Sequence, residues 1–337
     1  MKNRIRRLLF VLWILPANTV STGFAAIQAP PEKALSPAAV QKALAYSKDR
    51  NGLSLVLMQN GRLILEDYHN GFEKDDSHIL TSATKSFSGA ILAALIDDGL
   101  VASFDEKVSA TIAEWKGDPR KSDITLRELL SLSSGLDPGE VGRVIPYAQA
   151  VQSQVLSPHG TVFQYGPAPF QIFGEVVKRK LRGENALAYL TTRIFRPIGL
   201  QAKGWRFGRD GNPNLASGAD LQAREWIKFG EFVRLRGRWG ERQIVRPDLV
   251  EELLKPSAAN PAYGIAFWLK TGGDADAEEG GAAPARASAQ PQLKVIMAAG
   301  AGKQRLYIID EFDLVVARQG KASSFLDAEF LSILLNR

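Results

Sequence analysis

Segments typical of β-strands stand at both ends of this 337-residue chain, while its long middle is typical of helices. The segments 53–58 and 63–65 flank Asn60-Gly61, a dipeptide that favours a two-residue hairpin turn. Strand-like segments return only near the other end, at 262–269, 293–298, 305–309 and 314–317, before a closing helix over 325–335. We therefore predict an α+β fold, in which one antiparallel sheet is built from both termini with flanking helices, and an all-helical lobe is inserted between them.

The first 25 residues differ from the rest in composition. Four basic residues precede an apolar run over 8–17, and small residues follow up to Ala25. This order is typical of a secretory signal peptide, and the run is about half as long as a membrane span. We predict a signal peptide over 1–25 with cleavage after Ala25, no stable membrane span, and a periplasmic or secreted protein. An uncleaved anchor is the alternative.

We expect residues 26–337 to form a single domain. Its α/β lobe is predicted over 26–81 and 256–337, and its helical lobe over 82–255. Helix starts are marked by Ser36-Pro37 and by a capping box from Thr125 to Glu128. Helices are also predicted over 82–98, 170–181, 186–195 and 224–235. The segment 272–290, rich in Gly, Ala, Asp and Glu, is expected to be a surface loop.

Charge and residue content argue against two classes of partner. The formal net charge is +6, but removal of the predicted signal peptide leaves 38 basic and 36 acidic residues. Nucleic-acid binding needs clustered basic charge, so we expect no nucleic-acid partner. The chain has no cysteine, and His69, His78 and His159 show no metal-ligand spacing. We expect no metal site and place the histidines on the surface or in loops.

Ser82 is the one serine that is followed three residues later by a lysine, Lys85. On a helix that begins at Ser82, the hydroxyl and the amine lie on the same face. The positive end of the helix dipole favours an oxyanion there, and a desolvated lysine can lose its proton near neutral pH. We therefore predict Ser82 as nucleophile and Lys85 as its base. The pair alone is weak evidence, because an exposed serine and a solvated lysine can share this spacing.

Longer blocks of the chain resemble the superfamily of serine β-lactamases and penicillin-binding proteins, in particular its class C-like branch of esterases and amide hydrolases. The resemblance covers nearly the whole chain after the signal peptide, from the hairpin at Leu53 to Val316. Besides Ser82 and Lys85, it rests on blocks in the family's order at 124–136, 160–174 and 215–218. It implies an acyl-enzyme mechanism on Ser82 without a metal or organic cofactor.

The superfamily's second motif is Tyr-x-Asn. A literal match, Tyr68-His69-Asn70, precedes Ser82 and cannot occupy the helical lobe, whereas Tyr165-Gly166-Pro167 matches by position. The resemblance implies that Tyr165 shares a proton with Lys85 and protonates the leaving group. A core tyrosine at a helix entrance is the alternative. Pro167 replaces the asparagine amide that family β-lactamases direct at the substrate's acyl side chain, which counts against penicillin-type recognition.

The third motif is Lys-Thr-Gly or a variant on a strand beside the nucleophile. A literal Lys270-Thr271-Gly272 runs into the predicted loop, whereas Ala298-Ala299-Gly300 is followed by two strands in the family's usual arrangement. We prefer the second site. There the backbone N–H groups of Ala301 and Ser82 would form an oxyanion hole, worth about 3 kcal/mol in the transition state. This choice removes the lysine that would bind a substrate carboxylate, which both β-lactams and D-alanyl peptides carry.

The sequence therefore predicts a serine hydrolase that cleaves a small-molecule ester or amide. Ser82 attacks the carbonyl, Lys85 accepts the proton, and Tyr165 relays it to the leaving group. A carboxylesterase or small-amide hydrolase is favoured. A β-lactamase or D-alanyl-D-alanine carboxypeptidase is the first alternative, and a non-catalytic envelope binding protein of the same fold is the second.

Overall fold

The computed structural model describes residues 33–271 and 293–337. The predicted signal peptide and the predicted loop over 272–290 lie outside the described residues, as does Gly272. The described residues belong to one compact unit.

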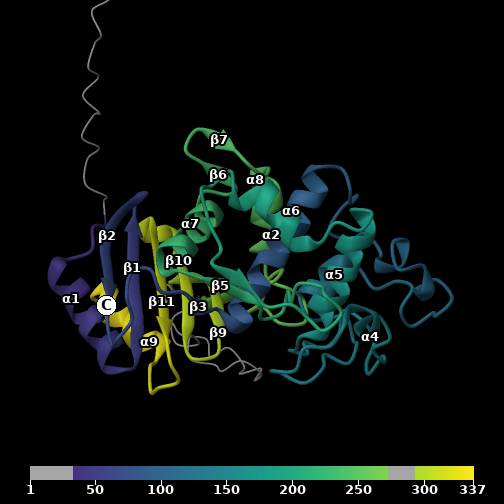
Figure 1. The fold of residues 1–337 in the computed structure, drawn as a ribbon, viewed down its shortest axis with the longest axis horizontal. Helices are drawn as coiled ribbons and strands as arrows, with labels where there is room; N and C mark the ends of the chain where they lie inside the picture. The colour runs from purple at the N-terminus through teal and green to yellow at the C-terminus, as the bar shows by residue number, and fades with distance from the viewer. Residues whose placement is uncertain (1–32, 272–292) are drawn as a thin grey trace, which may run out of the picture. The chain divides into compact units, whose positions relative to one another are not determined.

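A six-stranded antiparallel sheet joins the two ends of the chain (Figure 1). Its order is β2-β1-β11-β10-β9-β8, in which β1, from the N-terminal part, pairs with β11, from the C-terminal part. The bounds are Gly52–Gln59 for β1, Arg62–Tyr68 for β2, Trp268–Thr271 for β8, Lys294–Gly300 for β9, Gln304–Ile309 for β10 and Leu314–Gly320 for β11. The β1–β2 turn has positive φ at Asn60 (49°) and Gly61 (71°), as a type I′ hairpin requires. The predicted mixture of helices with an antiparallel sheet is confirmed.

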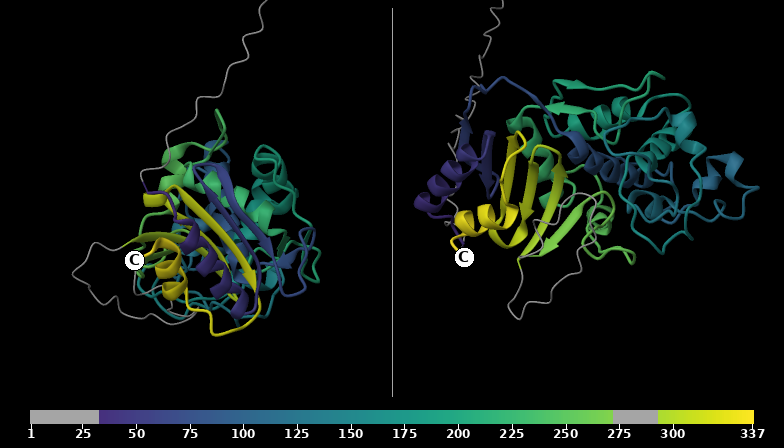
Figure 2. Two further views of the ribbon diagram at one scale, coloured as in Figure 1. Left: turned by 90° about the vertical axis from the view of Figure 1, so that its left-hand side faces the viewer. Right: turned by 90° about the horizontal axis from the view of Figure 1, so that it is seen from below.

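Helices cover both faces of this sheet (Figure 2). Helices α1, Pro37–Asp49, and α9, Asp327–Leu335, pack together on one face, where Tyr307 of β10 stacks on Phe330 of α9. The predicted cap of α1 is present, since the Ser36 side chain accepts a hydrogen bond from the Ala39 N–H. Helix α7, Ala223–Arg234, covers the other face.

Helix α7 falls inside the range that the sequence predicts for the helical lobe, but it packs on β1, β10 and β11. Gly230 allows the close approach, because a Cβ at this position would lie 2.4 Å from Cγ1 of Val315. Helical periodicity reports that a helix has an apolar face and does not report what that face packs on. The lobe boundary is therefore wrong for this helix.

The helical lobe is built around α2, Lys85–Asp97. Helices α5, α6 and α8 contact α2 directly. The other helices and helical turns are η1 Thr81–Thr84, η2 Val108–Ala110, η3 Ala113–Trp115, α3 Leu126–Leu130, α4 Tyr147–Val151, α5 Ala168–Lys180, α6 Ala186–Leu190, η4 Thr191–Phe195, α8 Pro247–Leu253 and η6 Asp310–Phe312. Short strands are β3 His78–Ile79, β4 Gly204–Trp205, β5 Ala219–Leu221, β6 Arg238–Trp239 and β7 Arg242–Gln243.

The strand predicted over 262–269 is mostly wrong. Only its last two residues belong to β8, which begins at Trp268. Before that point the backbone bonds to the helical lobe: the N–H of Ile265 donates to Leu253 O at 2.9 Å, and the N–H of Ala266 donates to Leu130 O at 3.1 Å. An apolar run can be buried in either way, and sequence alone does not decide which backbone partners it meets.

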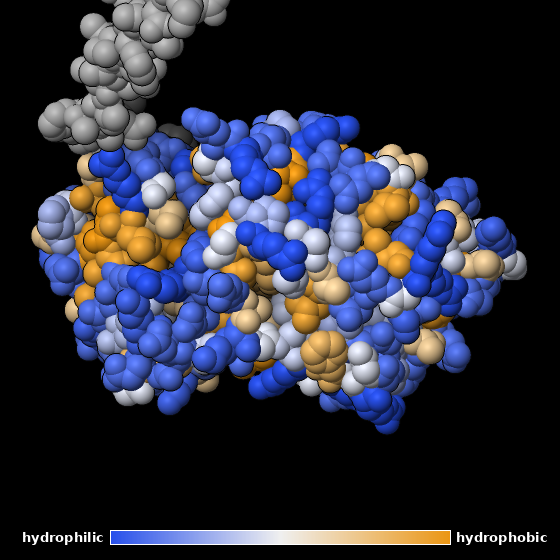
Figure 3. All heavy atoms as spheres, turned by 45° about the horizontal axis from the view of Figure 1, so that its top comes forward, coloured by the Kyte–Doolittle hydropathy of each residue, from blue (hydrophilic) through white to orange (hydrophobic). Residues whose placement is uncertain are grey.

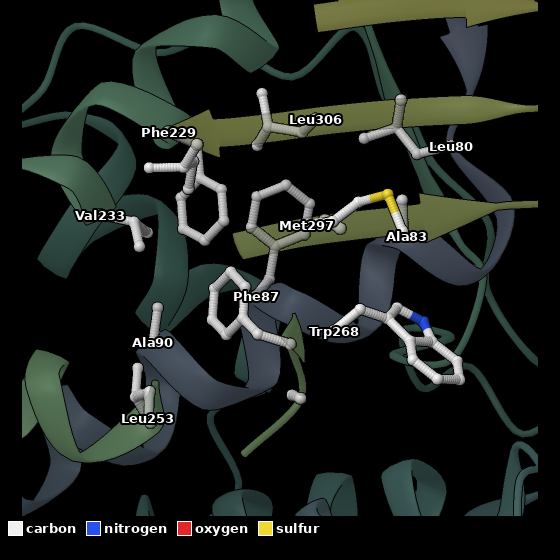
Figure 4. Close-up of a cluster of buried hydrophobic side chains, with 14 of the residues drawn as sticks. Leu80, Ala83, Phe87, Ala90, Phe229, Val233, Leu253, Trp268, Met297 and Leu306 are labelled. Atoms are coloured by element: carbon white, nitrogen blue, oxygen red, sulfur yellow. The ribbon is translucent and has the colours of Figure 1, made fainter. Parts of the chain in front are cut away.

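One apolar core extends from the sheet into the helical lobe. Figure 4 shows Phe87 of α2 between residues of α7 and strands β9 and β10, and its ring centroid lies 4.5 Å from that of Phe229. Leu80 and Ala83, which lie on either side of the Ser82 turn, belong to the same cluster. Residues before and after Ser82 therefore anchor the start of α2 in the core that it shares with the sheet.

The face in Figure 3 is mainly hydrophilic, with separate hydrophobic patches. Leu63 and Ile64, on the edge strand β2, are 46% and 43% exposed. Within the described residues, no helix combines the length and the apolar character needed to span a membrane.

Candidate active site

Ser82 lies in the 3₁₀ turn η1, which runs directly into α2 at Lys85. In a 3₁₀ turn, residues i and i+3 lie one above the other, so the serine and the lysine are aligned. Two backbone-anchored hydrogen bonds hold this turn to β5, from Leu80 N to Ala219 O at 2.8 Å and from Ala219 N to the Thr84 hydroxyl at 3.1 Å. Thr81 adopts a φ of 48°, a left-handed conformation that costs a non-glycine residue about 1–3 kcal/mol. Such strain persists only where surrounding contacts impose it.

Lys85 is buried, with 4% of its surface exposed. Its Nζ donates to the carbonyl oxygen of Ala216 at 3.0 Å. The same nitrogen lies 4.9 Å from the ring centroid of Tyr165 and 5.5 Å from that of Phe170. Burial of an amine disfavours its charged form, which is the condition that a lysine base needs.

The carbonyl that meets Lys85 belongs to a rigid turn around Asn214. The Asn214 side-chain oxygen accepts hydrogen bonds from the N–H groups of Ala216, at 3.0 Å, and Ser217, at 3.1 Å. Its amide donates to the Ser217 hydroxyl at 2.7 Å. The block 215–218 is part of the family resemblance, but no role was predicted for it. An asparagine three residues before a serine is a turn signal that could have pointed to this anchor.

Tyr165 lies at the entrance to α5, half-buried, with its ring stacked on Trp268 at a centroid distance of 5.8 Å. Pro167 is the N-cap of α5, and the next residue, Ala168, donates its N–H to Pro138 O at 2.9 Å. Tyr165, which matches the second motif by position, therefore lies beside Lys85.

The literal match Tyr68-His69-Asn70 lies at the end of β2 and in the turn that follows. The Asn70 amide donates to the carbonyl oxygens of Lys48, at 2.9 Å, and Gly52, at 2.8 Å. These bonds hold β1 and the end of α1 together, so the asparagine has a structural task there.

Strand β9 brings Gly300 against the Ser82 turn. A Cβ at Gly300 would lie 2.1 Å from Leu80 O, 2.3 Å from the Thr81 hydroxyl and 3.0 Å from Ala83 N. The Thr81 hydroxyl is also within hydrogen-bonding distance of Ala301 O, at 3.3 Å. Only a residue without a side chain fits at this contact, and Gly300-Ala301 is therefore adjacent to the Ser82 turn.

Lys270 and Thr271 lie on β8, opposite Val295 and Lys294. Lys294 and Gly300 are the two ends of β9. At about 3.3 Å per residue, the ends of this strand are roughly 20 Å apart. The literal Lys-Thr pair is thus at the end of β9 that is far from the Ser82 turn.

His69 lies in the loop after β2, as the sequence suggested, but it is buried. It is 9% exposed, and its Nδ1 is 2.9 Å from the Asp67 carboxylate. Burial lowers the pKa of His69 below its ordinary value, and Asp67 offsets this only in part. The part of the chain that the structure describes has no cluster of three or more potential metal-ligating side chains of the His, Cys, Asp or Glu type.

The arrangement combines a serine at a helix start, a buried amine one turn away, a phenol ring beside that amine and a strand end packed on the serine turn. These are the parts that an activated serine nucleophile with an oxyanion site uses.

Comparison with known proteins identifies the family and the fold. The family model of the β-lactamase domain matches residues 36–290. EstCE1, described as a hydrolase with promiscuous acyltransferase activity, is similar in structure with a TM-score of 0.69 and 15% identity, over 89% of this chain and 98% of that one. A penicillin-binding protein homologue from Caulobacter crescentus gives 0.68 and 15%, over 88% and 95% of the two chains. A class C β-lactamase from Rhodobacter sphaeroides gives 0.65 and 14%, over 89% and 99%.

No match to this chain is found among the curated proteins. The structural likenesses, all at low identity, show a shared fold, and the family model covers most of the sequence. The chain belongs to the β-lactamase family, within the superfamily of serine β-lactamases and penicillin-binding proteins.

Proposed function

We propose that this protein hydrolyses an ester or amide of a small molecule through an acyl-enzyme on Ser82. The observation that carries the proposal is the buried Lys85 amine, one helical turn from Ser82 and 4.9 Å from the Tyr165 ring. The Ser82 oxygen attacks the substrate carbonyl while Lys85 Nζ accepts its proton. Tyr165 passes a proton to the leaving group, and water then releases the acyl group by the reverse relay. The N–H groups of Ser82 and Ala301 stabilise the oxyanion.

Two features favour a carboxylesterase or small-amide hydrolase over a β-lactamase or D-alanyl carboxypeptidase. Pro167 supplies no side-chain amide at the second motif. The strand against the Ser82 turn carries Ala298 and Ala299, without the lysine that would bind a substrate carboxylate. Both losses weaken recognition of an acylamino carboxylate and leave the acyl-transfer groups intact.

Labelling with a fluorophosphonate tests the nucleophile. The purified protein is expected to gain the mass of one phosphonyl group, located at Ser82 by peptide mapping, and Ser82→Ala should not be labelled. Ser86→Ala is the matched control, because Ser86 is also buried, lies one turn further along in α2 and donates its hydroxyl to Ala83 O at 2.8 Å. A folded wild-type protein that never acylates would support the non-catalytic binding protein instead.

Turnover of three probes tests the substrate class. We expect hydrolysis of short-chain aryl esters, with little hydrolysis of a chromogenic cephalosporin or of a D-alanyl-D-alanine peptide. The opposite order of kcat/KM would favour the β-lactamase or carboxypeptidase alternative.

We also propose that the protein is exported. Its basic and apolar N-terminus supports this, and the mature protein should begin at Ala26. N-terminal sequencing of protein from the periplasmic fraction checks the cleavage site, and intact Met1 in the cytoplasmic fraction alone would overturn it.

A further inference from the structure

We propose that Arg305 is a positioning residue, which aims the Ala301 N–H by holding the carbonyl of the preceding residue. The inference rests on the proposed function, in which this N–H stabilises the oxyanion. Arg305 is the second residue of β10 and is 6% exposed. Its Nη1 donates to Gly300 O at 3.1 Å and to Gln304 O at 3.0 Å.

The geometry of the peptide group connects Arg305 to Ala301. The Gly300 carbonyl and the Ala301 N–H belong to one peptide group, and the described chain contains no cis peptide bond. In a planar trans peptide the C=O and N–H point in opposite directions. A donor that fixes the Gly300 carbonyl therefore also fixes the direction of the Ala301 N–H.

The Ala301 N–H points away from β10, toward the other edge of β9. Gly300 is paired with Gln304 of β10, and the single Arg305 Nη1 is within 3.1 Å of the carbonyl oxygens of both residues. In an antiparallel pair this is possible only where the two carbonyls face each other, so the Gly300 carbonyl is on the β10 side and the Ala301 N–H is on the opposite side. On this opposite side the pairing of β8 with β9 ends at Met297, three residues before Gly300. The N–H thus points to a strand edge that β8 leaves open, next to the turn that carries Ser82.

Arg305 is itself fixed in place. Its Nε lies 2.7 Å from Asp327 Oδ1 and its Nη2 lies 3.2 Å from Oδ2, a bidentate pair with a carboxylate that is 1% exposed. The Tyr307 hydroxyl donates to the same carboxylate. A guanidinium on a carbonyl oxygen also polarises the peptide group, which strengthens its N–H as a donor.

The neighbouring peptide group is held in a similar way. The fully buried Gln304 amide is 3.3 Å from both Ala301 O and Gly302 O, and 2.6 Å from Gly320 O. The peptide groups on both sides of Ala301 are therefore bonded to buried side chains, and Arg305 is the charged one of the two.

The test compares Arg305→Lys and the double variant Arg305→Gln/Asp327→Asn with the wild type. The double variant removes both charges of the Arg305–Asp327 pair together, so neither is left buried without the other, which guards against simple misfolding. We expect the rate constant of Ser82 phosphonylation and kcat for an aryl acetate to fall about 10- to 100-fold, less than for complete loss of an oxyanion donor, with KM within about twofold. Thermal unfolding is measured on every variant.

Tyr307→Phe is the matched control, because it removes a hydrogen bond to Asp327 from the same buried cluster and leaves the contact with Gly300. We expect it to lower Tm and keep kcat. If both Arg305 variants kept wild-type rates, the positioning role would be overturned. The proposed function would still stand if Ser82 of the wild type were labelled. An equal loss of kcat in Tyr307→Phe would also overturn the positioning role, because it would show that any weakening of this buried cluster lowers activity. A wild type that is never labelled would refute both proposals.

Discussion

The Lys85 amine donates a hydrogen bond to the Ala216 carbonyl at 3.0 Å. A neutral amine that donates one N–H to a fixed acceptor has its lone pair directed elsewhere. The Asn214 turn holds that acceptor, and Ser82 lies one 3₁₀ turn before Lys85. In the proposed mechanism this bond orients the amine as the base for the serine hydroxyl.

Replacing Lys85 tests this role. Lys85→Arg keeps a positive charge that cannot be lost near neutral pH, and Lys85→Met keeps a side chain of similar length without a base. We expect both to lower kcat/KM for an aryl ester by about 10²- to 10⁴-fold. Thermal unfolding should show that Lys85→Met remains folded, since it removes a buried polar group along with its cost. Retention of more than a tenth of the activity by Lys85→Arg would rule out the base role.

Tyr165→Phe separates proton transfer from packing. The ring would keep its stacking on Trp268, so we expect Tm and KM to change little while kcat falls by about 10²-fold or more. Tyr263→Phe is the matched control, because Tyr263 packs edge-on against the same Trp268 at 4.9 Å. Steady-state kinetics of the two variants measure this difference. Equal kcat values for Tyr165→Phe and Tyr263→Phe would show that the Tyr165 hydroxyl takes no part in the mechanism.

The choice of third motif can be tested with one variant at Gly300, at the end of β9, and one at Lys270 on the neighbouring strand β8. A methyl group at Gly300 would meet Leu80 O at 2.1 Å, so Gly300→Ala must displace the strand end from the Ser82 turn. We expect a loss of kcat of about 10²-fold, near the effect of losing an oxyanion donor. Lys270→Ala should leave kcat within about twofold of the wild type. A collapse of kcat in Lys270→Ala would restore Lys270-Thr271-Gly272 as the motif.

His69 makes stability depend on pH. Its pKa is lowered from 6.5, chiefly by burial, and its Nε2 is buried without a hydrogen-bond partner among the residues that the structure describes. Below about pH 6.5 the unfolded chain therefore binds more protons at this site than the folded protein does, and stability falls as pH decreases toward the folded-state pKa.

Urea unfolding of wild type and His69→Asn at about pH 7.5 and pH 5.5 measures this effect. We expect the wild type to lose up to roughly 1 kcal/mol more than the variant over this interval. Asn can replace the Nδ1 donor to Asp67 and does not titrate. The same pH dependence in both proteins would show that His69 is not the source.

Local signals in the sequence were sufficient for much of the fold. Asn60-Gly61 predicted the hairpin, Ser36-Pro37 predicted the start of α1, and the Thr125–Glu128 capping box is present. These signals succeed because each depends on backbone preferences within a few residues. The strand predicted over 262–269 and the lobe assigned to α7 failed because both depend on distant partners.

The candidate site divides in the same way. The spacing of Ser82 and Lys85, and the order of the blocks around Tyr165, could be seen in the sequence because one helical turn and the family's chain order define them. The Ala216 carbonyl, the Trp268 ring and the Arg305–Gly300 contact were not predicted, since each joins residues far apart in the chain.

The sequence by itself therefore determined the α+β class, the candidate nucleophile with its base, and membership of a superfamily. Only the tertiary structure decided which strand end meets the Ser82 turn. The sequence offers two motifs that end in glycine, Lys270-Thr271-Gly272 and Ala298-Ala299-Gly300, as the strand end beside Ser82. Gly300 is the glycine that contacts the Leu80 backbone, and this contact leaves no space for a side chain. Steric exclusion between distant segments has no local signal, because it exists only once the sheet and the helical lobe have packed together.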